Sequence, residues 1–366
     1  MEEESSGTRQ RSAVQTTRVG AVEKKIGFLS FGHWQPIPGS RVRTGRDALV
    51  QSIELAVAAE ELGVDGAYVR VHHFARQLAS PFPLLAAMAA RTSRIEVGTA
   101  VIDMRYENPL YMAEEAAATD LISGGRLQLG ISRGSPETAL RGSEAFGYVP
   151  PDDTSDSEVA RHKTKLFLAA ISGQTVVDAD PQMTGGQSGR LAIQPQSPDL
   201  RERIWWGSGT RATAEWAAHQ GMNLMSSTLL VEDTGVPFDE LQAEQIARFR
   251  AAWTEAGWER EPRVSVSRSV MPILTDLDRQ YFGERSDDDQ VGILDGVRAR
   301  FGKSYVGEPD RLADELAKDA AVQAADTLLI TVPNMLGVEY NARLLENVVR
   351  YVAPAIGWAP PDQRSA

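Results

Sequence analysis

The sequence predicts a (β/α)₈ barrel, a ring of eight parallel strands in which a helix follows each strand. Eight short apolar segments rich in Val, Ile and Leu alternate with segments whose apolar residues recur at helical spacing. Strands of this composition are typical of parallel sheets that are buried on both faces. Eight such units in one chain of 366 residues fit a single closed barrel better than an open sheet.

The first half of the chain contains four strand–helix units. The helix after the first strand ends at Gly63, since glycine favours a helix end. The helix after the second strand has Ser80 as a candidate N-cap and Pro81 at its first position. The third helix ends at Gly124–Gly125. The four predicted strands are Lys25–Phe31, Gly66–Val71, Arg94–Ile102 and Arg126–Gly134.

The second half repeats this alternation around two longer segments. Ser135–Ser157 follows the fourth strand and Asp276–Tyr305 follows the seventh, and long loops of this kind commonly act as lids. We expect one domain over residues 25–353, a disordered or loosely attached N-terminal tail at 1–24 and a C-terminal tail at 354–366. The predicted strands are Arg203–Gly209, Met222–Ser227, Arg263–Leu274 and Asp326–Pro333.

The composition favours a protein that acts on small molecules. A net charge of −12 argues against binding to nucleic acid or to an anionic membrane surface. The chain has no cysteine, which excludes thiolate catalysis and Cys-based metal sites. It contains no apolar run of the ~20 residues that a membrane helix needs, and the N-terminal segment lacks the apolar core of a secretory signal. We therefore expect a cytoplasmic protein.

Two of the five histidines, His72 and His73, stand side by side at the end of the second strand. Barrel enzymes work at the C-terminal ends of their strands, so this position predicts a site residue. Adjacent strand residues point to opposite faces, so one histidine can face the barrel mouth while the other packs outside. The same geometry makes a shared metal ion unfavourable, and no nearby carboxylate completes a ligand set.

The segment Gly207–Thr213 (GSGTRAT) predicts an anion site. Its glycines allow close approach of a ligand to the backbone, and the helix that follows directs its free N–H groups and its dipole to the same point. Taken alone, the segment fits equally well a helix that is simply capped by Ser208 or Thr210. Arg133, at the end of the neighbouring strand, favours the anion site because its guanidinium can bind a phosphate with two hydrogen bonds.

These residues resemble the bacterial luciferase-like family of flavin-dependent monooxygenases. The similarity lies in VHHF, in the run from ASPFPLLAAMAARTSRIEVGTAVI to SGGRLQLGISRG, and in IWWGSGTRATAEWAAHQG, and it extends over roughly Ile26 to Val352. The SGGR…LG…RG segment is the most specific part. The resemblance implies the same barrel fold, with reduced FMN across its C-terminal mouth.

The resemblance also assigns residues. The FMN phosphate would be held by Arg133, Gly209, Thr210 and Thr213, and the flavin ring by a non-proline cis peptide at Ala100–Val101. His72 matches the active-site histidine, whereas His73 and Glu114 match residues near the subunit interface of a homodimer. We further expect the substrate pocket to include Met104, Arg105, Ser227, Thr228 and Asn334. Trp205 and Trp206 are expected to pack in the barrel rather than on the flavin.

Two positions depart from the family pattern. Val71 stands where the family commonly has a glutamate before the histidines, and Ser132 stands at the position of the reactive cysteine of luciferases. Neither change affects flavin binding, but both weaken a prediction of light emission or of long aldehyde substrates.

The leading functional hypothesis is a two-component monooxygenase. A separate reductase would supply reduced FMN, O₂ would form a flavin hydroperoxide, and one oxygen atom would enter a small organic substrate, with His72 as general acid or base. Three alternatives stay open: a deazaflavin-dependent oxidoreductase that transfers hydride without oxygen, a non-catalytic flavin-binding protein, and a sugar-phosphate barrel without flavin. The third would need carboxylates or a metal at the strand ends, where Asp103 is the only obvious carboxylate.

Overall fold

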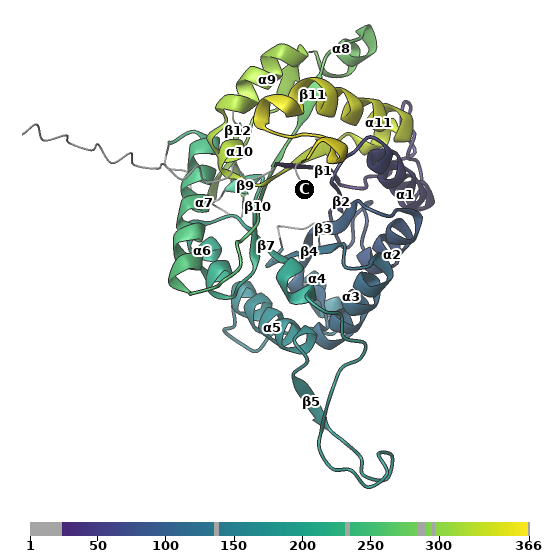
Figure 1. Ribbon diagram of the computed structural model, residues 1–366, viewed down its shortest axis with the longest axis vertical. Helices are drawn as coiled ribbons and strands as arrows, with labels where there is room; N and C mark the ends of the chain where they lie inside the picture. The colour runs from purple at the N-terminus through teal and green to yellow at the C-terminus, as the bar shows by residue number, and fades with distance from the viewer. Residues whose placement is uncertain (1–23, 135–138, 231–234, 284–289, 295–296, 365–366) are drawn as a thin grey trace, which may run out of the picture.

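The computed structural model describes residues 24–134, 139–230, 235–283, 290–294 and 297–364, so nearly all of the predicted N-terminal tail lies outside the described residues. Eight parallel strands close a barrel in the order β1-β15-β10-β8-β7-β4-β3-β2, and helices surround it (Figure 1). The predicted fold class is confirmed. The strands are β1 (Lys25–Ser30), β2 (Gly66–Val69), β3 (Glu96–Asp103), β4 (Leu127–Ser132), β7 (Ile204–Ser208), β8 (Asn223–Ser226), β10 (Val264–Arg268) and β15 (Thr327–Val332).

Local capping fixes where the outer helices begin and end. Asn108 accepts hydrogen bonds from the amides of Leu110 and Tyr111 at the start of α3, and Gly124 ends that helix at φ 68°. Ser80 occupies the N-cap position of α2 as predicted, but its side chain makes no capping hydrogen bond. The main outer helices are α1 (Gly45–Glu61), α2 (Pro81–Arg91), α3 (Pro109–Ser123), α5 (Asp156–Ile171), α6 (Arg211–His219), α7 (Phe238–Glu255), α9 (Pro309–Lys318) and α11 (Val338–Asn347).

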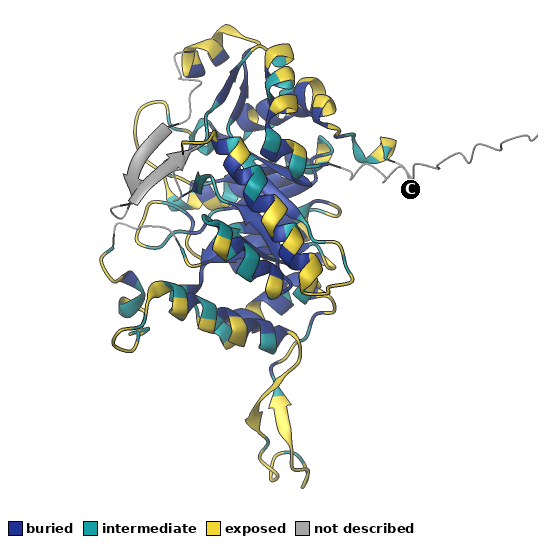
Figure 2. Cartoon of the chain, turned by 90° about the vertical axis from the view of Figure 1, so that its left-hand side faces the viewer, coloured by how far each residue is buried: buried dark blue, intermediate teal, exposed yellow. Residues whose placement is uncertain are grey.

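The barrel has an interior core distinct from the layer between strands and helices. Inside the ring, large apolar side chains pack together, and most residues of the barrel strands are buried (Figure 2). The predicted packing role of Trp205 is confirmed, because its indole is fully buried and its Nε1 donates to Gln128 Oε1 at 2.8 Å. The interior cluster consists of Leu29, Tyr68, Trp205, Met225 and Leu329.

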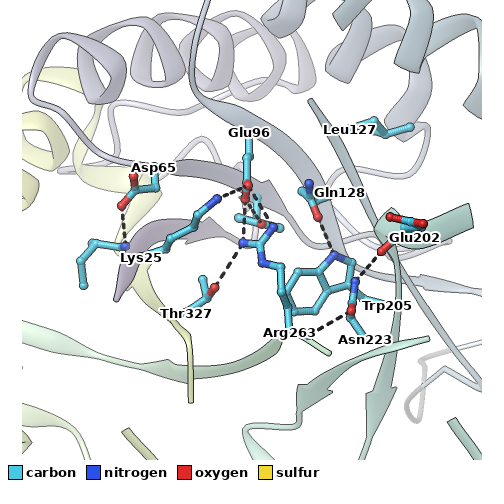
Figure 3. Close-up of polar contacts among 12 residues, drawn as sticks. Lys25, Asp65, Glu96, Leu127, Gln128, Glu202, Trp205, Asn223, Arg263 and Thr327 are labelled. Atoms are coloured by element: carbon cyan, nitrogen blue, oxygen red, sulfur yellow. Dashed lines mark hydrogen bonds and ion pairs between the residues drawn. The ribbon is translucent and has the colours of Figure 1, made fainter. Parts of the chain in front are cut away.

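A polar cluster lies at the N-terminal ends of the barrel strands (Figure 3). Glu96 accepts hydrogen bonds from both terminal nitrogens of Arg263, at 2.9 and 3.0 Å, and from Lys25 Nζ at 2.6 Å. The hydroxyl of Tyr68 donates to the same carboxylate at 3.2 Å. Burial opposes the charged form of Glu96, but Arg263 and Lys25 outweigh it and hold the pKa of this carboxyl below its ordinary value.

Replacing Glu96 with Ala should lower the free energy of unfolding by about 3 kcal/mol, because it leaves the partly buried guanidinium of Arg263 without its carboxylate. Because the pKa of Glu96 is lower in the folded protein than its ordinary value of 4.5, the Glu96 carboxylate stabilises the fold above pH 4.5. This stabilisation is lost as the pH falls through the folded-state pKa. The difference in free energy of unfolding between the unsubstituted protein and Glu96→Ala should therefore be smaller in acid. Urea unfolding at pH 7 and pH 4 measures this difference. Glu61→Ala, at an exposed position, is the matched control; an equal loss in both variants would contradict the role of Glu96.

The predicted seventh strand, Arg263–Leu274, is two strands. β10 ends at Arg268, and β11 (Val270–Pro272) leaves the barrel to pair with β14 (Tyr305–Gly307). Arg268 is buried and donates to Asp319 at 2.7 and 3.0 Å, and Tyr305 donates to the same carboxylate at 2.6 Å. This anchor ties the end of β10 to the outer layer, so the chain turns outward there.

The two segments predicted as long loops contain additional elements. The first, whose residues 135–138 lie outside the described part, carries the short helix α4 (Gly142–Ala145). The second carries α8 (Asp276–Phe282) and a hairpin of β12 (Gln290–Leu294) and β13 (Val297–Phe301). β13 also pairs with β9 (Leu229–Leu230), which places the hairpin beside the barrel mouth.

A second hairpin, β5 (Thr175–Asp178) and β6 (Arg190–Ala192), projects away from the barrel (Figure 1) and is almost entirely exposed (Figure 2). The sequence did not predict it, because its residues carry no burial pattern.

The prediction of a loose C-terminal tail from residue 354 is wrong. Trp358 is buried and its Nε1 donates to Asp65 at 2.8 Å, while Arg364 donates to both oxygens of the same carboxylate at 2.6 and 2.9 Å. Asp65 also accepts the amide of Ile26 at 2.9 Å. The C-terminal segment is thus attached to the beginning of the barrel strands by one shared carboxylate.

Candidate active site

A cavity of about 400 Å³ opens at the C-terminal ends of the barrel strands, where barrel enzymes bind their ligands. Its wall comes from the ends of β2, β3, β4, β7 and β8 and from the first turns of α5 and α6. The structure thus brings together most of the residues that the sequence singled out. The predicted residues that line the cavity are His72, Ala100, Val101, Arg133, Gly209, Thr210, Thr213, Ser227 and Thr228.

One side of the cavity is built around the start of α6. Thr210 is the N-cap residue, and its hydroxyl accepts the amide of Thr213 at 3.2 Å. Ser208 does not cap the helix; its hydroxyl donates to the carbonyl of Thr210 at 2.8 Å. Capping and ligand binding are therefore compatible, because Gly209, Thr210 and Thr213 also face the cavity. The first turn of a helix offers unpaired N–H groups and the positive end of its dipole to an anion.

Two arginines line the cavity near this helix start. Arg133 follows β4 and is exposed, and Arg161 reaches the cavity from α5. The guanidinium of Arg161 lies over the ring of Trp216, 5.1 Å from its centroid, which limits its freedom. Ser157, in the first turn of α5, lines the same space. Two guanidinium groups and two helix starts form a donor set suited to a phosphate dianion.

Arg161 was missed from the sequence because Ser135–Ser157 was treated as a long loop and no helix start was recognised within it. The structure begins α5 at Asp156, after a capping box in which the Ser155 side chain accepts the amide of Glu158 and the Glu158 carboxylate accepts the amide of Ser155. A serine followed three residues later by glutamate is a recognisable helix start, so the signal was present.

A pair of buried glutamines on α7 supports the start of α6. Gln245 Nε2 donates to the carbonyls of Ser208 and Thr210, at 3.3 and 3.0 Å, and its Oε1 accepts the Ser226 hydroxyl at 2.6 Å. Gln242 Nε2 donates to the same hydroxyl at 3.0 Å. The backbone of the GSGT turn is therefore held from behind by side chains that do not line the cavity.

For FMN, the ligand that the resemblance implies, replacing Gln245 with Leu should weaken binding by about tenfold, because two carbonyls and one hydroxyl lose a partner and the turn is no longer fixed. Riboflavin, which lacks the phosphate, should bind within threefold of its original affinity. Fluorescence titration with both flavins gives the ratio of their dissociation constants. A general loss of structure would weaken the binding of both flavins equally and leave this ratio unchanged. Gln187→Leu, in the exposed hairpin, is the control.

The floor of the cavity lies on β3. The peptide bond between Ala100 and Val101 is cis, as the resemblance predicted, and both residues line the cavity. The pairing of β3 with β4 shifts between Thr99 and Ile102, around this bond. Gly207 faces it from β7, where a Cβ would lie 3.0 Å from Val101 Cγ1. This glycine therefore leaves the space above Val101 open.

Comparison with known proteins identifies the family of this chain. The model of the luciferase-like monooxygenase family matches residues 26–281. The chain belongs to this family. It is 22% identical over 367 residues to the oxygenase component of flavin-dependent trigonelline monooxygenase from Acinetobacter baylyi, covering 93% of this chain and 98% of that protein.

Solved structures share the fold of this luciferase-like monooxygenase. The oxygenating constituent of 3,6-diketocamphane monooxygenase from Pseudomonas putida, in complex with FMN, has a TM-score of 0.63 at 17% identity, over 91% of this chain and 98% of that one. A coenzyme F420-dependent tetrahydromethanopterin reductase from Methanopyrus kandleri has a TM-score of 0.60 at 14% identity, over 91% and 99%.

The two adjacent histidines of this luciferase-like monooxygenase have different surroundings. His72 lines the cavity, and its Nε2 accepts a hydrogen bond from Arg70 Nε at 2.8 Å. His73 does not line it; its ring stacks on Tyr106 with centroids 4.2 Å apart and meets the edge of Phe146. The expected division between a site histidine and a packed histidine therefore matches their placement.

Among the described residues, no three His, Cys, Asp or Glu side chains could hold a metal ion.

A further histidine lies near this group. His33 stacks on Phe31 with centroids 5.8 Å apart, and Gln77 holds its ring. Burial first, and then the neighbouring His72 and Arg70, lower the pKa of His33. Arg70 therefore adds a positive charge to the side of the mouth formed by β1 and β2.

Three residues predicted for the substrate pocket do not line the cavity. Met104 is fully buried in the core outside the barrel. Arg105 turns back to Asp103, donating from Nη2 at 2.6 Å. Asn334 accepts the amide of His33 at 3.2 Å and donates to its carbonyl at 2.7 Å, which connects two loops. Each side chain is held by neighbours, and a strand-end position in the sequence does not reveal this.

Both departures from the family pattern are accommodated locally. Val71 is buried among apolar side chains. Ser132 lines the cavity and its hydroxyl accepts the amide of Gly134 at 2.8 Å, which fixes the turn that presents Arg133. None of the described helices combines the length and apolar character that a membrane crossing requires.

Proposed function

We propose that this chain is the oxygenase of a two-component system that binds FMN reduced by a separate reductase and uses O₂ to oxygenate a small organic molecule. The observation that carries the proposal is one cavity that joins an anion site, formed by Arg133, Arg161 and the start of α6, to the open surface at Ala100–Val101. The relative named as an oxygenase component and the neighbour in complex with FMN support it.

The charge and the hydrogen-bond donors of the lining residues suit FMN. Arg133, Arg161 and the amides at the start of α6 would hold the phosphate, and Ala100–Val101 would support the ring. Bound and reduced, FMN supplies the two electrons with which one oxygen atom of O₂ becomes water while the other enters the substrate. Apolar side chains of the barrel interior, such as Leu29 and Met225, exclude water from below.

His72 would handle protons at the reacting centre. It is the histidine that faces the cavity, and the hydrogen bond from Arg70 Nε to its Nε2 fixes the ring with that nitrogen as acceptor. The other ring nitrogen, Nδ1, is then the one that carries a proton in the neutral form. A positioned acid or base of this kind contributes typically 10²–10⁴-fold to a rate.

A deazaflavin-dependent hydride transfer is the second candidate, favoured by the F420-dependent neighbour. Arg133 and the start of α6 could bind the phosphate of either cofactor. Two guanidinium groups at one anion site favour the doubly charged monoester of FMN over a singly charged diester.

Anaerobic titration with reduced FMN, riboflavin and coenzyme F420 tests the cofactor. The proposal expects reduced FMN to bind at least tenfold more tightly than either of the others. Tighter binding of the deazaflavin would replace the monooxygenase with the hydride-transfer enzyme.

We also propose a homodimer that uses the outer face of α3. Glu114 is exposed there, and large apolar side chains are exposed along the same helix: Leu110, Tyr111, Leu121 and Ile122. Large apolar side chains that are exposed together on one helix are a feature of interaction surfaces. Light scattering at low micromolar concentration should give twice the mass of the chain, and Tyr111→Glu should reduce it to that of a monomer. A monomer before the substitution would reject the dimer.

A further inference from the structure

Arg70 stands on the cavity wall at the end of β2. Its guanidinium lies over the ring of Phe31, 4.9 Å from the centroid, and its Nε donates to His72. The backbone amide of Arg70 donates to the carbonyl of Ser30 at 2.9 Å, which fixes the residue to β1. Two neighbouring rings thus define the plane of this guanidinium, so little conformational entropy is left to lose when it binds a ligand.

Arg70 lies apart from the anion site described above. In the barrel order, β3 with its open surface at Ala100–Val101 separates β2 from β4, which carries Arg133, and β7, which leads to Gly209. The proposed phosphate position and Arg70 therefore lie on different sides of the proposed ring position. The cofactor phosphate therefore does not account for the presence of Arg70 in this cavity.

The charges on the cavity wall favour an anionic guest. Its described lining includes three arginines and one carboxylate, Asp103. Arg133 and Arg161 are assigned to the cofactor phosphate, so Arg70 is the arginine whose charge acts on a second ligand. Arg105 already binds the Asp103 carboxylate with Nε at 3.1 and 3.0 Å and with Nη2 at 2.6 Å. A cationic amine would enter a positive potential here, whereas an anion would gain from it.

We infer that Arg70 is the recognition group for the substrate and that the substrate is an organic carboxylate. The inference rests on the proposed function. A planar guanidinium binds a carboxylate through two parallel hydrogen bonds and so fixes its orientation as well as its position. Because Arg70 also contacts His72, a carboxylate bound to it is placed next to the proposed acid or base. Arg70 is a binding residue in this account, and His72 remains the catalytic one.

Benzoate and its neutral analogue benzamide test the inference by calorimetry on the full chain loaded with FMN. The unsubstituted protein should bind benzoate at least tenfold more tightly than benzamide. Arg70→Met should reduce this ratio to about one, and Arg70→Lys should retain part of it. Arg76→Met is the matched control: Arg76 is exposed over Trp34 at 5.5 Å, does not line the cavity, and its replacement should leave the ratio unchanged.

The outcomes separate this inference from the proposed function. If benzoate binds no better than benzamide, or if the preference survives in Arg70→Met, Arg70 does not recognise a carboxylate. If Arg70→Met instead weakens reduced FMN more than tenfold and leaves the benzoate preference intact, Arg70 serves the flavin and the inference is overturned. If the unsubstituted chain fails to bind FMN, the proposed function fails, and the benzoate ratio measured without flavin still decides the role of Arg70. Thermal melting of both Arg70 variants confirms that they are folded.

Discussion

Replacing His72 with Asn should lower oxygen-dependent product formation by about 100-fold or more, because the proposed proton donor or acceptor is removed from the cavity wall. The asparagine amide would keep a polar group near Arg70 but cannot exchange a proton. The dissociation constant for FMN should change less than threefold, since the phosphate site lies on other strands. Initial rates with an accepted substrate, saturating reduced FMN and O₂ measure the effect.

The neighbouring histidine is the control for this experiment. His73 packs against Tyr106 and Phe146 and does not line the cavity. His73→Gln should reduce thermal stability while leaving the rate per folded molecule within threefold. Equal losses of rate in both variants would show that the pair acts through packing and that His72 has no proton-transfer role.

Replacing Arg133 with Met should weaken the binding of reduced FMN by about 10–100-fold. This is the effect expected when a hydrogen bond between charged groups, worth about 1.5–3 kcal/mol, is lost. Riboflavin should be unaffected, because it has no phosphate for Arg133 to bind. Arg161→Met should give a smaller loss of the same kind. Equilibrium titration under anaerobic conditions, with both flavins and both variants, supplies the comparison.

The double variant shows whether the two arginines share one anion. If both bind the same phosphate, their losses should not simply add, since residues that contact one group are coupled. Arg141→Met controls for a loss of positive charge, because Arg141 is 75% exposed and pairs with Glu144 away from the cavity. An equal loss of FMN and riboflavin affinity in Arg133→Met would contradict the phosphate site.

The sequence predicts the barrel well because its strands are buried on both faces. Segments such as Thr327–Val332 are short runs of apolar and β-branched residues, and the helices between them carry caps such as Asn108 and Gly124 that mark their ends. The β5–β6 hairpin was missed for the opposite reason: every residue of β5 is exposed, so no periodicity records it. The C-terminal segment was misjudged because its attachment depends on Asp65, a residue almost three hundred positions earlier.

The candidate site was predictable where backbone chemistry decides it. The Gly-Ser-Gly-Thr turn and Arg133 could be placed at the mouth because strand ends converge there. Arg70 received no role, since strand alternation alone does not say which face of a barrel strand meets a cavity. Met104 and Arg105 were misplaced because burial and the Asp103–Arg105 ion pair are properties of packing.

Rapid mixing of the anaerobic complex of the protein and reduced FMN with oxygenated buffer tests the central proposal most directly. We expect the spectrum to pass through a form distinct from both reduced and oxidised FMN, and oxidised FMN to return more slowly than in the absence of protein. Bound flavin that stays reduced under O₂, or that oxidises at the rate of free FMN without such a form, would contradict a monooxygenase.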